Sequence, residues 1–224
     1  MSRSLDLYRC HWKWLFSLLV VLLTGARSTA EDWPQLLGGG LRSGNAPDFA
    51  VDEALGLLAA VPMSDAILAS PVVSGTYAYV VDGSGILACI DIATGKKQWQ
   101  FKTEGGQGNC NNVASPCVIN GYVHVGTMAG FYYVLGCSDG KLVRRVDCGE
   151  PIFAAPVAGG GRVYFATLGA RLYCVQPDGV SNWEWDFVRE VIGFDGDRWK
   201  GDEWLAFRGD RVTWRDHFVC SREI

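Results

Sequence analysis

A stretch of about forty residues recurs three times along the chain, and this repeat constrains the fold more than any other feature of the sequence. A proline stands near the start of each copy, at intervals of 45 and 40 residues, and a glycine stands near its end, at intervals of 45 and 39 residues. A period of this size is typical of solenoids, propellers and other repeat arrays. The residues that mark it are Pro71, Pro116 and Pro156, and Gly95, Gly140 and Gly179.

Each copy is built from short apolar runs separated by glycine-bearing turns. In the first copy, residues 77–81 read YAYVV and residues 86–91 read ILACID, with the turn DGSG between them. Runs of this length, rich in Val, Ile, Tyr and Phe and bounded by such turns, are typical of β-hairpins, and Asn120-Gly121 is the strongest hairpin signal in the chain. Paired helices would need longer apolar patterns than these glycines and prolines allow.

Four antiparallel strands in about forty residues make one blade of a β-propeller. Blades that pack against neighbours on both sides need apolar residues on both faces, which explains why residues 79–81 and 163–166 barely alternate. We therefore predict an all-β fold, a β-propeller of four-stranded antiparallel blades. The blades are expected at residues 69–113, 114–153 and 154–187, with a partial blade at residues 188–224.

The number of repeats predicts an incomplete ring. A closed propeller takes four to eight blades, and the chain has three clear blades and part of a fourth. We expect an open or truncated ring, preceded by an N-terminal segment at residues 31–68 that adds a partial outer strand. Unpaired outer blades of such an arc would favour self-association through their edges.

The first thirty residues have the organisation of a secretory signal peptide. Basic residues precede an apolar run at residues 14–23, and small residues follow at 28–30, where signal peptidase requires them. We predict that residues 1–30 are cleaved after Ala30 and that the protein is exported to the periplasm or the extracellular space. The alternative is that residues 1–30 stay attached as an uncleaved membrane anchor. The rest of the sequence has no run of eighteen apolar residues, so we expect no other membrane span.

Charge limits the kinds of partner. With residues 1–30 removed, the chain has 16 basic and 23 acidic residues and a net charge of −7. No basic face can dominate the long-range field of such a chain, so we predict no nucleic-acid partner and no anionic membrane partner. A protein partner is the remaining expectation.

Seven cysteines follow residue 30, so one is left unpaired even in an oxidising compartment. Cys89 and Cys174 occupy the same place in the first and third repeats, and Cys117 stands where the first repeat has Val72. These positions favour small core residues in strands, and the sequence leaves any disulfide pairing open. Because the chain has no Cys-x-x-Cys pair and no histidine beside two cysteines, we predict no zinc site.

Residues 85–99, GILACIDIATGKKQW, resemble the blade motif of the pyrroloquinoline-quinone-like (quinoprotein-type) β-propellers. In that family a strand reading Leu-Tyr-Ala-Leu-Asp leads into Thr-Gly-Lys and then a tryptophan that packs against the neighbouring blade. Trp99 and Trp183 match the tryptophan position. Arg144 stands there in the second repeat, and Ala59 in the stretch before the first.

The resemblance covers residues 69–187 well and residues 31–68 weakly. The opening EDWPQ at residues 31–35 is similar to the mature start of many exported bacterial members. The resemblance implies the propeller fold but no single function, because the family holds dehydrogenases, assembly lipoproteins and sensor domains on one scaffold.

A quinone-dependent alcohol dehydrogenase is the enzyme that the resemblance implies. Such enzymes hold the quinone over a tryptophan floor with Ca²⁺ beneath it, often under a vicinal cysteine disulfide, and use an aspartate base. The chain has no adjacent Cys-Cys pair, and Asp82, Asp91 and Asp139 fall in turns or at strand ends, where blades place acids as structural caps. We therefore predict no catalytic, cofactor-binding or metal-binding residue, and no cofactor.

The late part of the chain carries Asp195 and Asp197 in Asp-x-Asp spacing. A calcium loop beginning at Asp195 would need Asp or Asn at its fifth position, Gly at its sixth and Glu at its twelfth, where the chain has Trp, Lys and Ala. We interpret this stretch as a solvated loop between strands, followed by a hairpin from Trp204 to Trp214.

Three further patterns have a plain structural interpretation. His124 lies in a strand pattern and is expected to be hydrogen-bonded, and Arg208-Gly209-Asp210 is an adhesion tripeptide that arises by chance in turns. The late aromatic residues predict core between blades, with a peptide- or carbohydrate-binding platform as the alternative. These aromatic residues are Trp183, Trp185, Phe187, Trp199, Trp204, Phe207 and Trp214.

Taken together, these features favour an exported, non-catalytic β-propeller module that binds or scaffolds protein through its blade tops and central channel. The first alternative is a fragment of a quinone-dependent alcohol dehydrogenase whose active-site blades lie beyond Ile224. The second is the ectodomain of a membrane-anchored signalling protein.

Overall fold

The structure is a computed structural model that describes residues 32–39, 41–44, 56–199, 203 and 206–207. The chain divides into two compact units, Met1–Glu31 and Asp32–Ile224. The first unit, which contains the predicted signal peptide, lies outside the described residues. Within the described part of the chain, no helix has the length and apolar character needed to cross a membrane.

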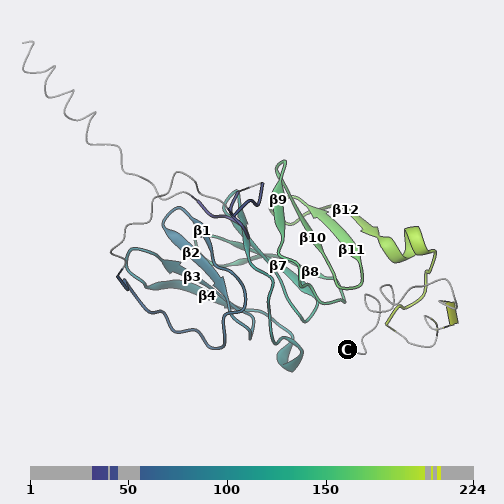
Figure 1. Cartoon of the computed structure of the whole chain (residues 1–224), viewed down its shortest axis with the longest axis horizontal. Helices are drawn as coiled ribbons and strands as arrows, with labels where there is room; N and C mark the ends of the chain where they lie inside the picture. Colours follow the sequence, from purple (N-terminus) through teal and green to yellow (C-terminus); the bar gives the residue numbers. More distant parts are fainter. Residues whose placement is uncertain (1–31, 40, 45–55, 200–202, 204–205, 208–224) are drawn as a thin grey trace, which may run out of the picture. The chain divides into compact units, whose positions relative to one another are not determined.

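The second unit contains three four-stranded antiparallel sheets, each made of four consecutive strands (Figure 1). They are the blades that the repeat predicts. Blade 1 consists of β1 (Val72–Ser74), β2 (Tyr77–Val81), β3 (Ile86–Asp91) and β4 (Lys97–Lys102). Blade 2 consists of β5 (Cys117–Ile119), β6 (Tyr122–Gly126), β7 (Phe131–Gly136) and β8 (Leu142–Asp147). Blade 3 consists of β9 (Val157–Gly159), β10 (Arg162–Ala166), β11 (Arg171–Val175) and β12 (Ser181–Asp186).

The hairpin turns follow the turn chemistry of the sequence. Asn120 and Gly121 join β5 to β6, and both have positive φ angles, 49° and 79°. This is the backbone of a type I′ turn, whose twist matches that of the flanking strands. The strongest hairpin signal in the sequence is therefore confirmed.

Each blade has the same irregularity between its last two strands. In blade 1 the register shifts after Cys89, which is paired with Trp99. Blades 2 and 3 shift at the equivalent places, after Val134 and after Cys174. A bulge bends a strand and increases its local twist. The three outer strands therefore present the position of Trp99 in the same way.

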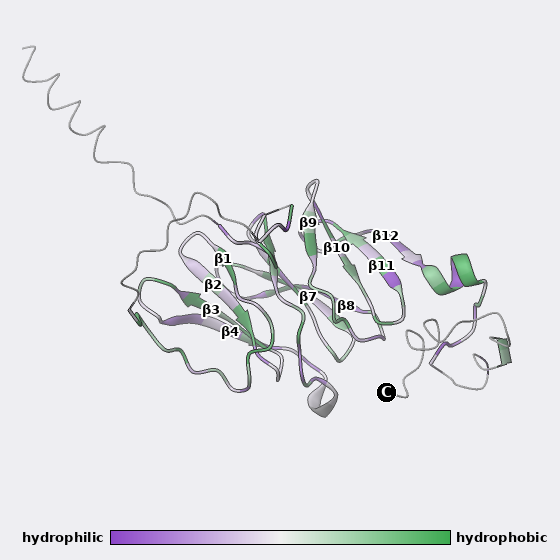
Figure 2. Ribbon diagram, in the orientation of Figure 1, coloured by the Kyte–Doolittle hydropathy of each residue, from purple (hydrophilic) through white to green (hydrophobic). Residues whose placement is uncertain are grey.

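The hydrophobic core lies between neighbouring blades. Tyr133 and Leu135 of β7 join the cluster shared with blade 1, whereas Tyr132 and Val134 join the cluster shared with blade 3. Because the middle blade is covered on both faces, its two central strands, β6 and β7, are almost entirely buried. The outer strands β4, β8 and β12 are mostly exposed, and β12 is coloured mostly white to purple, whereas β10 is largely green (Figure 2).

The cysteines of the strands serve this core. Cys89, Cys117 and Cys174 are fully buried, as their places in the repeat predict. The six described cysteines, which also include Cys110, Cys137 and Cys148, are all free thiols.

Residues 188–199, the described start of the expected partial blade, contain no strand. A π-helix, η2 (Val188–Ile192), follows β12 directly, and a loop continues to Trp199. A short 3₁₀ helix, η1 (Gly106–Gly108), lies in the connection between blades 1 and 2. The predicted hairpin from Trp204 and the Arg208-Gly209-Asp210 tripeptide fall almost entirely outside the described residues.

Candidate functional site

Blade 1 docks on blade 2 through Trp99 and a glycine turn. A methyl group on Gly140 would lie 2.5 Å from the Trp99 ring, so only glycine allows the ring to lie flat against this turn. The Trp99 indole donates a hydrogen bond from Nε1 to the Cys137 carbonyl at 2.9 Å, and the Tyr79 hydroxyl reaches the same oxygen at 3.5 Å. Docking therefore depends on a glycine that makes room for the ring and on a backbone carbonyl that accepts its hydrogen bond.

The same position makes the same kind of contact elsewhere in the chain. A methyl group on Gly179 would lie 3.0 Å from Cδ of Arg144, whose Nε lies 3.4 Å from the Asp178 carbonyl oxygen. Ahead of blade 1, the Ala59 side chain lies against Gly95. The docking expected at Trp99 is therefore confirmed, and Arg144 and Ala59, which replace tryptophan at the same position, also contact the next glycine turn.

On the equivalent face of blade 3, the two tryptophans of β12 are exposed. By strand register, Tyr164, Cys174 and Trp183 lie in one row across the sheet, and Ala166, Leu172 and Trp185 lie in the next. We call these six residues the exit face. Trp183 and Trp185 are 43% and 41% exposed, whereas the matching residues of blade 1, Trp99 and Phe101, pack on the core shared with blade 2.

The exit face also keeps the polar groups of a docking surface. The Tyr164 and Trp183 rings lie 6.1 Å apart, as the Tyr79 and Trp99 rings lie 5.9 Å apart in blade 1. In blade 1 both side chains donate to one carbonyl of the next blade. Among the described residues, no carbonyl takes that place for Tyr164 and Trp183. The inter-blade core predicted for Trp183 and Trp185 is therefore an exposed aromatic surface within this part of the chain.

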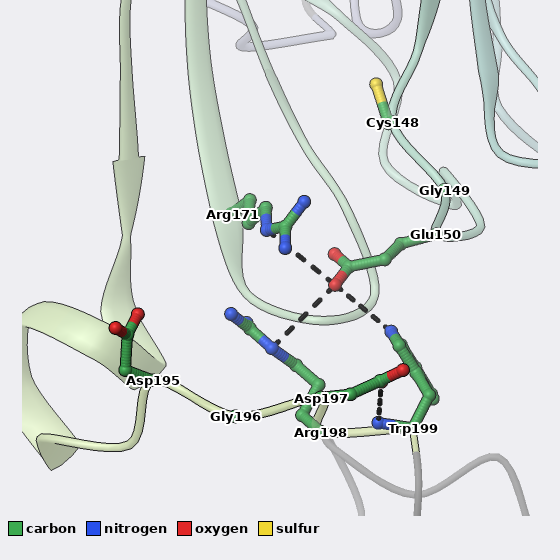
Figure 3. Close-up of a pocket in the computed structure, with 9 residues that line it drawn as sticks. All are labelled: Cys148, Gly149, Glu150, Arg171, Asp195, Gly196, Asp197, Arg198 and Trp199. Atoms are coloured by element: carbon green, nitrogen blue, oxygen red, sulfur yellow. Dashed lines mark hydrogen bonds and ion pairs between the residues drawn. The ribbon is translucent and has the colours of Figure 1, made fainter.

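A pocket of about 580 Å³ lies at the edge of blade 3 where β11 begins. Arg171, Arg198 and Trp199 point toward the carboxylate of Glu150 (Figure 3). The Glu150 side chain is 2% exposed and that of Arg198 is 4% exposed. Three separate segments meet here: the connection after β8, the start of β11, and the loop after η2.

Internal partners satisfy the buried carboxylate of Glu150. Its oxygens accept hydrogen bonds from the Thr167 hydroxyl at 2.6 Å and from Trp199 Nε1 at 3.1 Å. The guanidinium groups of Arg171 and Arg198 each lie 3.8 Å from it. Opposite charges at this distance neutralise the carboxylate in the protein interior.

Asp186, at the end of β12, completes the cluster. Arg198 donates to its carboxylate, Arg171 donates to it at 3.2 Å, and the Val188 N–H donates to it at 3.0 Å. Burial alone would raise the pKa of Asp186, but hydrogen bonds from Arg198 and from the Arg189 N–H outweigh it and lower the pKa. This arrangement holds the 193–199 loop onto blade 3.

Sequence reasoning missed this cluster. The loop was expected to be solvated, and residues 195–197 are exposed, yet Arg198 is buried and both Arg198 and Trp199 contact Glu150. Within the described residues, no group of three His, Cys, Asp or Glu side chains could hold a metal ion. The only local signal was the Asp-x-Asp spacing, and it concerns residues beside Arg198 instead of Arg198 itself.

The other residues singled out in the sequence have structural contacts. Asp82 is fully buried and accepts hydrogen bonds from the Ser84 hydroxyl at 2.8 Å and the Ile86 N–H at 2.9 Å. Asp91 and Asp139 each accept a backbone hydrogen bond within their own turns. His124 is hydrogen-bonded to the Tyr132 hydroxyl at 2.9 Å, as expected for a strand histidine.

Comparison with known proteins agrees with this geometry. Residues 58–142 match the family described as outer membrane protein assembly factor BamB, whose unit is a PQQ-like repeat. Residues 58–142 therefore carry the PQQ-like repeat, and membership of the family is supported over that part of the chain. No curated protein matches it.

Solved structures of PQQ-like propellers share the fold. The quinohemoprotein alcohol dehydrogenase of Comamonas testosteroni is 20% identical, with a TM-score of 0.60, over 74% of this chain and 28% of that one. BamB of Moraxella catarrhalis is 21% identical, with a TM-score of 0.50, over 56% of this chain and 42% of that one. The chain thus spans less than half the length of either, and the likeness establishes the fold alone.

Proposed function

We propose that the chain is a non-catalytic β-propeller module that binds protein, and that the exit face is its contact surface. The observation that carries this proposal is the exposure of Trp183 and Trp185 at positions whose counterparts dock blade on blade. Tryptophan and tyrosine supply much of the binding energy at protein interfaces, because they bury a large apolar area and also donate a hydrogen bond. The acidic charge of the chain also favours protein over nucleic acid.

A quinone-dependent dehydrogenase is the alternative that the fold family implies, and the described residues do not fit a quinone site. Trp99 lies on the outer strand β4, where its ring packs on Gly140, so it is not free to form a floor for the quinone. Glu150, the buried carboxylate that lines the pocket, and Asp186 beside it are already paired with Arg171 and Arg198.

The proposal includes export. The N-terminal pattern of basic, apolar and small residues supports cleavage after Ala30 and a periplasmic or extracellular module. If residues 1–30 stay attached, the module is instead the ectodomain of a membrane-anchored protein. N-terminal sequencing of the exported protein separates the two forms.

Site-specific cross-linking tests the exit face. A photoreactive amino acid replaces Trp183 in the producing cells, and a control replaces Lys141, whose side chain is 83% exposed in a turn of blade 2. We expect a defined protein cross-link from position 183 and none from position 141. Equal capture at both positions, or tight quinone binding in an absorbance titration with Ca²⁺, would overturn the proposal.

A further inference from the structure

A short N-terminal segment runs past the innermost strand of every blade. Trp33 and Val73 of β1 exchange two backbone hydrogen bonds, at 2.9 and 2.8 Å, as an antiparallel bridge. The next carbonyl, that of Pro34, accepts from the Val118 N–H of β5 at 2.7 Å. The residue after it, Gln35, accepts from the Ala158 N–H of β9 through its side-chain oxygen, at 2.9 Å. Three consecutive residues therefore serve three blades.

The inner strands can hydrogen-bond to this segment because each strand is paired with another strand of its sheet on one side only. Strands β1, β5 and β9 are the first members of their sheets, paired with β2, β6 and β10. Their other edges present backbone N–H and C=O groups, which is the usual template for adding an extended segment. Proline is tolerated at position 34 because only its carbonyl is used.

Both ends of the segment are fixed. The Asp32 carboxylate accepts a hydrogen bond from the Gly75 N–H at 2.7 Å, and the Gly38 N–H donates to the Gln35 carbonyl at 3.0 Å. Gly38 has a φ of 88° and lies under the Trp33 ring, where a methyl group would be 3.2 Å from it. Gln35 is 2% exposed, so its amide replaces a backbone group inside the molecule.

We propose that the inner edges of β1, β5 and β9 form an acceptor groove for an extended peptide of the type aromatic-Pro-Gln, which Asp32–Gln35 occupies in cis. A partner protein that presents such a segment binds the same groove when the cis segment leaves. This inference rests on the proposed protein-binding function and adds a second contact site, at the inner strands, with a stated ligand chemistry. Specificity comes from the proline, which needs no donor, and from the glutamine, which must reach Ala158.

The test uses the full chain and a labelled synthetic peptide of residues 31–39. Gln35→Ala removes one acceptor from the cis segment and leaves its backbone bonds, so we expect the peptide to bind this variant about tenfold more tightly than the unaltered chain. A peptide with alanine in place of its own glutamine is the control, and we expect it to lose that gain. Fluorescence anisotropy measures both.

Hydrogen exchange locates the binding. The amides of Val73, Val118 and Ala158 should exchange faster in Gln35→Ala, most of all Ala158, and should regain protection with the peptide. If Gln35→Ala does not fold, Asp32→Ala opens the start of the segment and serves the same purpose. Faster exchange at these amides without peptide binding would overturn the groove. Because cross-linking from position 183 does not involve the groove, failure here is separate from failure of the exit face.

Discussion

His124 lies in an interior environment that disfavours the charged form of its imidazole. It is fully buried, and its Nε2 lies near the Pro177 backbone without a hydrogen bond of ordinary geometry. Burial lowers its pKa from 6.5 to about 4, against opposing effects of the Pro177 backbone and the Asp178 carboxylate. Blades 1 and 3 have Tyr79 and Tyr164 at this position, so only blade 2 has an ionisable base here.

His124 should make the protein acid-sensitive. The unfolded chain takes up a proton near pH 6.5 and the folded chain only near pH 4, so stability falls as the pH drops through this window, by about 3 kcal/mol in full. We expect His124→Tyr, the residue of the other two blades, to flatten this dependence. Urea unfolding at pH 7.5, 6 and 4.5 measures it, and an unchanged slope would contradict the assignment.

Glu150 tests whether the pocket cluster is structural. In Glu150→Gln the amide nitrogen cannot accept from Thr167 or Trp199, and Arg171 and Arg198 lose a counter-charge. We expect a loss of about 3 kcal/mol in unfolding free energy, at the lower end for a broken buried pair because Arg198 keeps Asp186. Glu190→Gln, at the exposed Arg189–Glu190 pair, is the control and should leave the unfolding free energy almost unchanged. Similar losses in both variants would refute a structural role.

At the scale of the element, the docking turn is the feature that repeats. Gly140 and Gly121 both have positive φ, 65° and 79°, but only Gly140 faces a neighbouring ring. Gly121→Ala should cost about 1 kcal/mol from backbone strain alone, whereas Gly140→Ala should cost about 1–3 kcal/mol more because the methyl group displaces Trp99. Chemical denaturation of the two variants measures the difference. Equal costs would mean that Trp99 moves freely away from the turn.

The sequence predicted features that recur within one repeat, and it missed contacts between residues that are far apart along the chain. The blades and the docking place of Trp99 repeat within about forty residues, so a periodic pattern reveals them. The contacts of Gln35 with Ala158, and of Glu150 with Arg198, occur once and join residues far apart along the chain. Such contacts depend on the finished arrangement of blades, and no local propensity or spacing encodes them.

At the scale of the whole molecule, the described blades present one covered and one uncovered end. Residues near Ala59 lie against the Gly95 turn of blade 1, whereas the exit face of blade 3 has 43% and 41% exposed tryptophans. Exposed aromatic surfaces of this kind drive association when protein concentration rises. The exit face should therefore decide how the protein behaves in solution.

We expect the protein to self-associate with increasing concentration, and we expect Trp183→Asn combined with Trp185→Asn to abolish this. The substitutions lie on an outer strand and face solvent, so they remove apolar area without emptying the core. Val143→Asn, on the outer strand of blade 2 and 44% exposed, is the matched control and should leave association unchanged. Sedimentation equilibrium measures the average mass of each variant. Loss of association in Val143→Asn as well would point to general surface hydrophobicity. Loss confined to the tryptophan pair would locate the self-association surface at the exit face, where Trp183 is the counterpart of the docking residue Trp99.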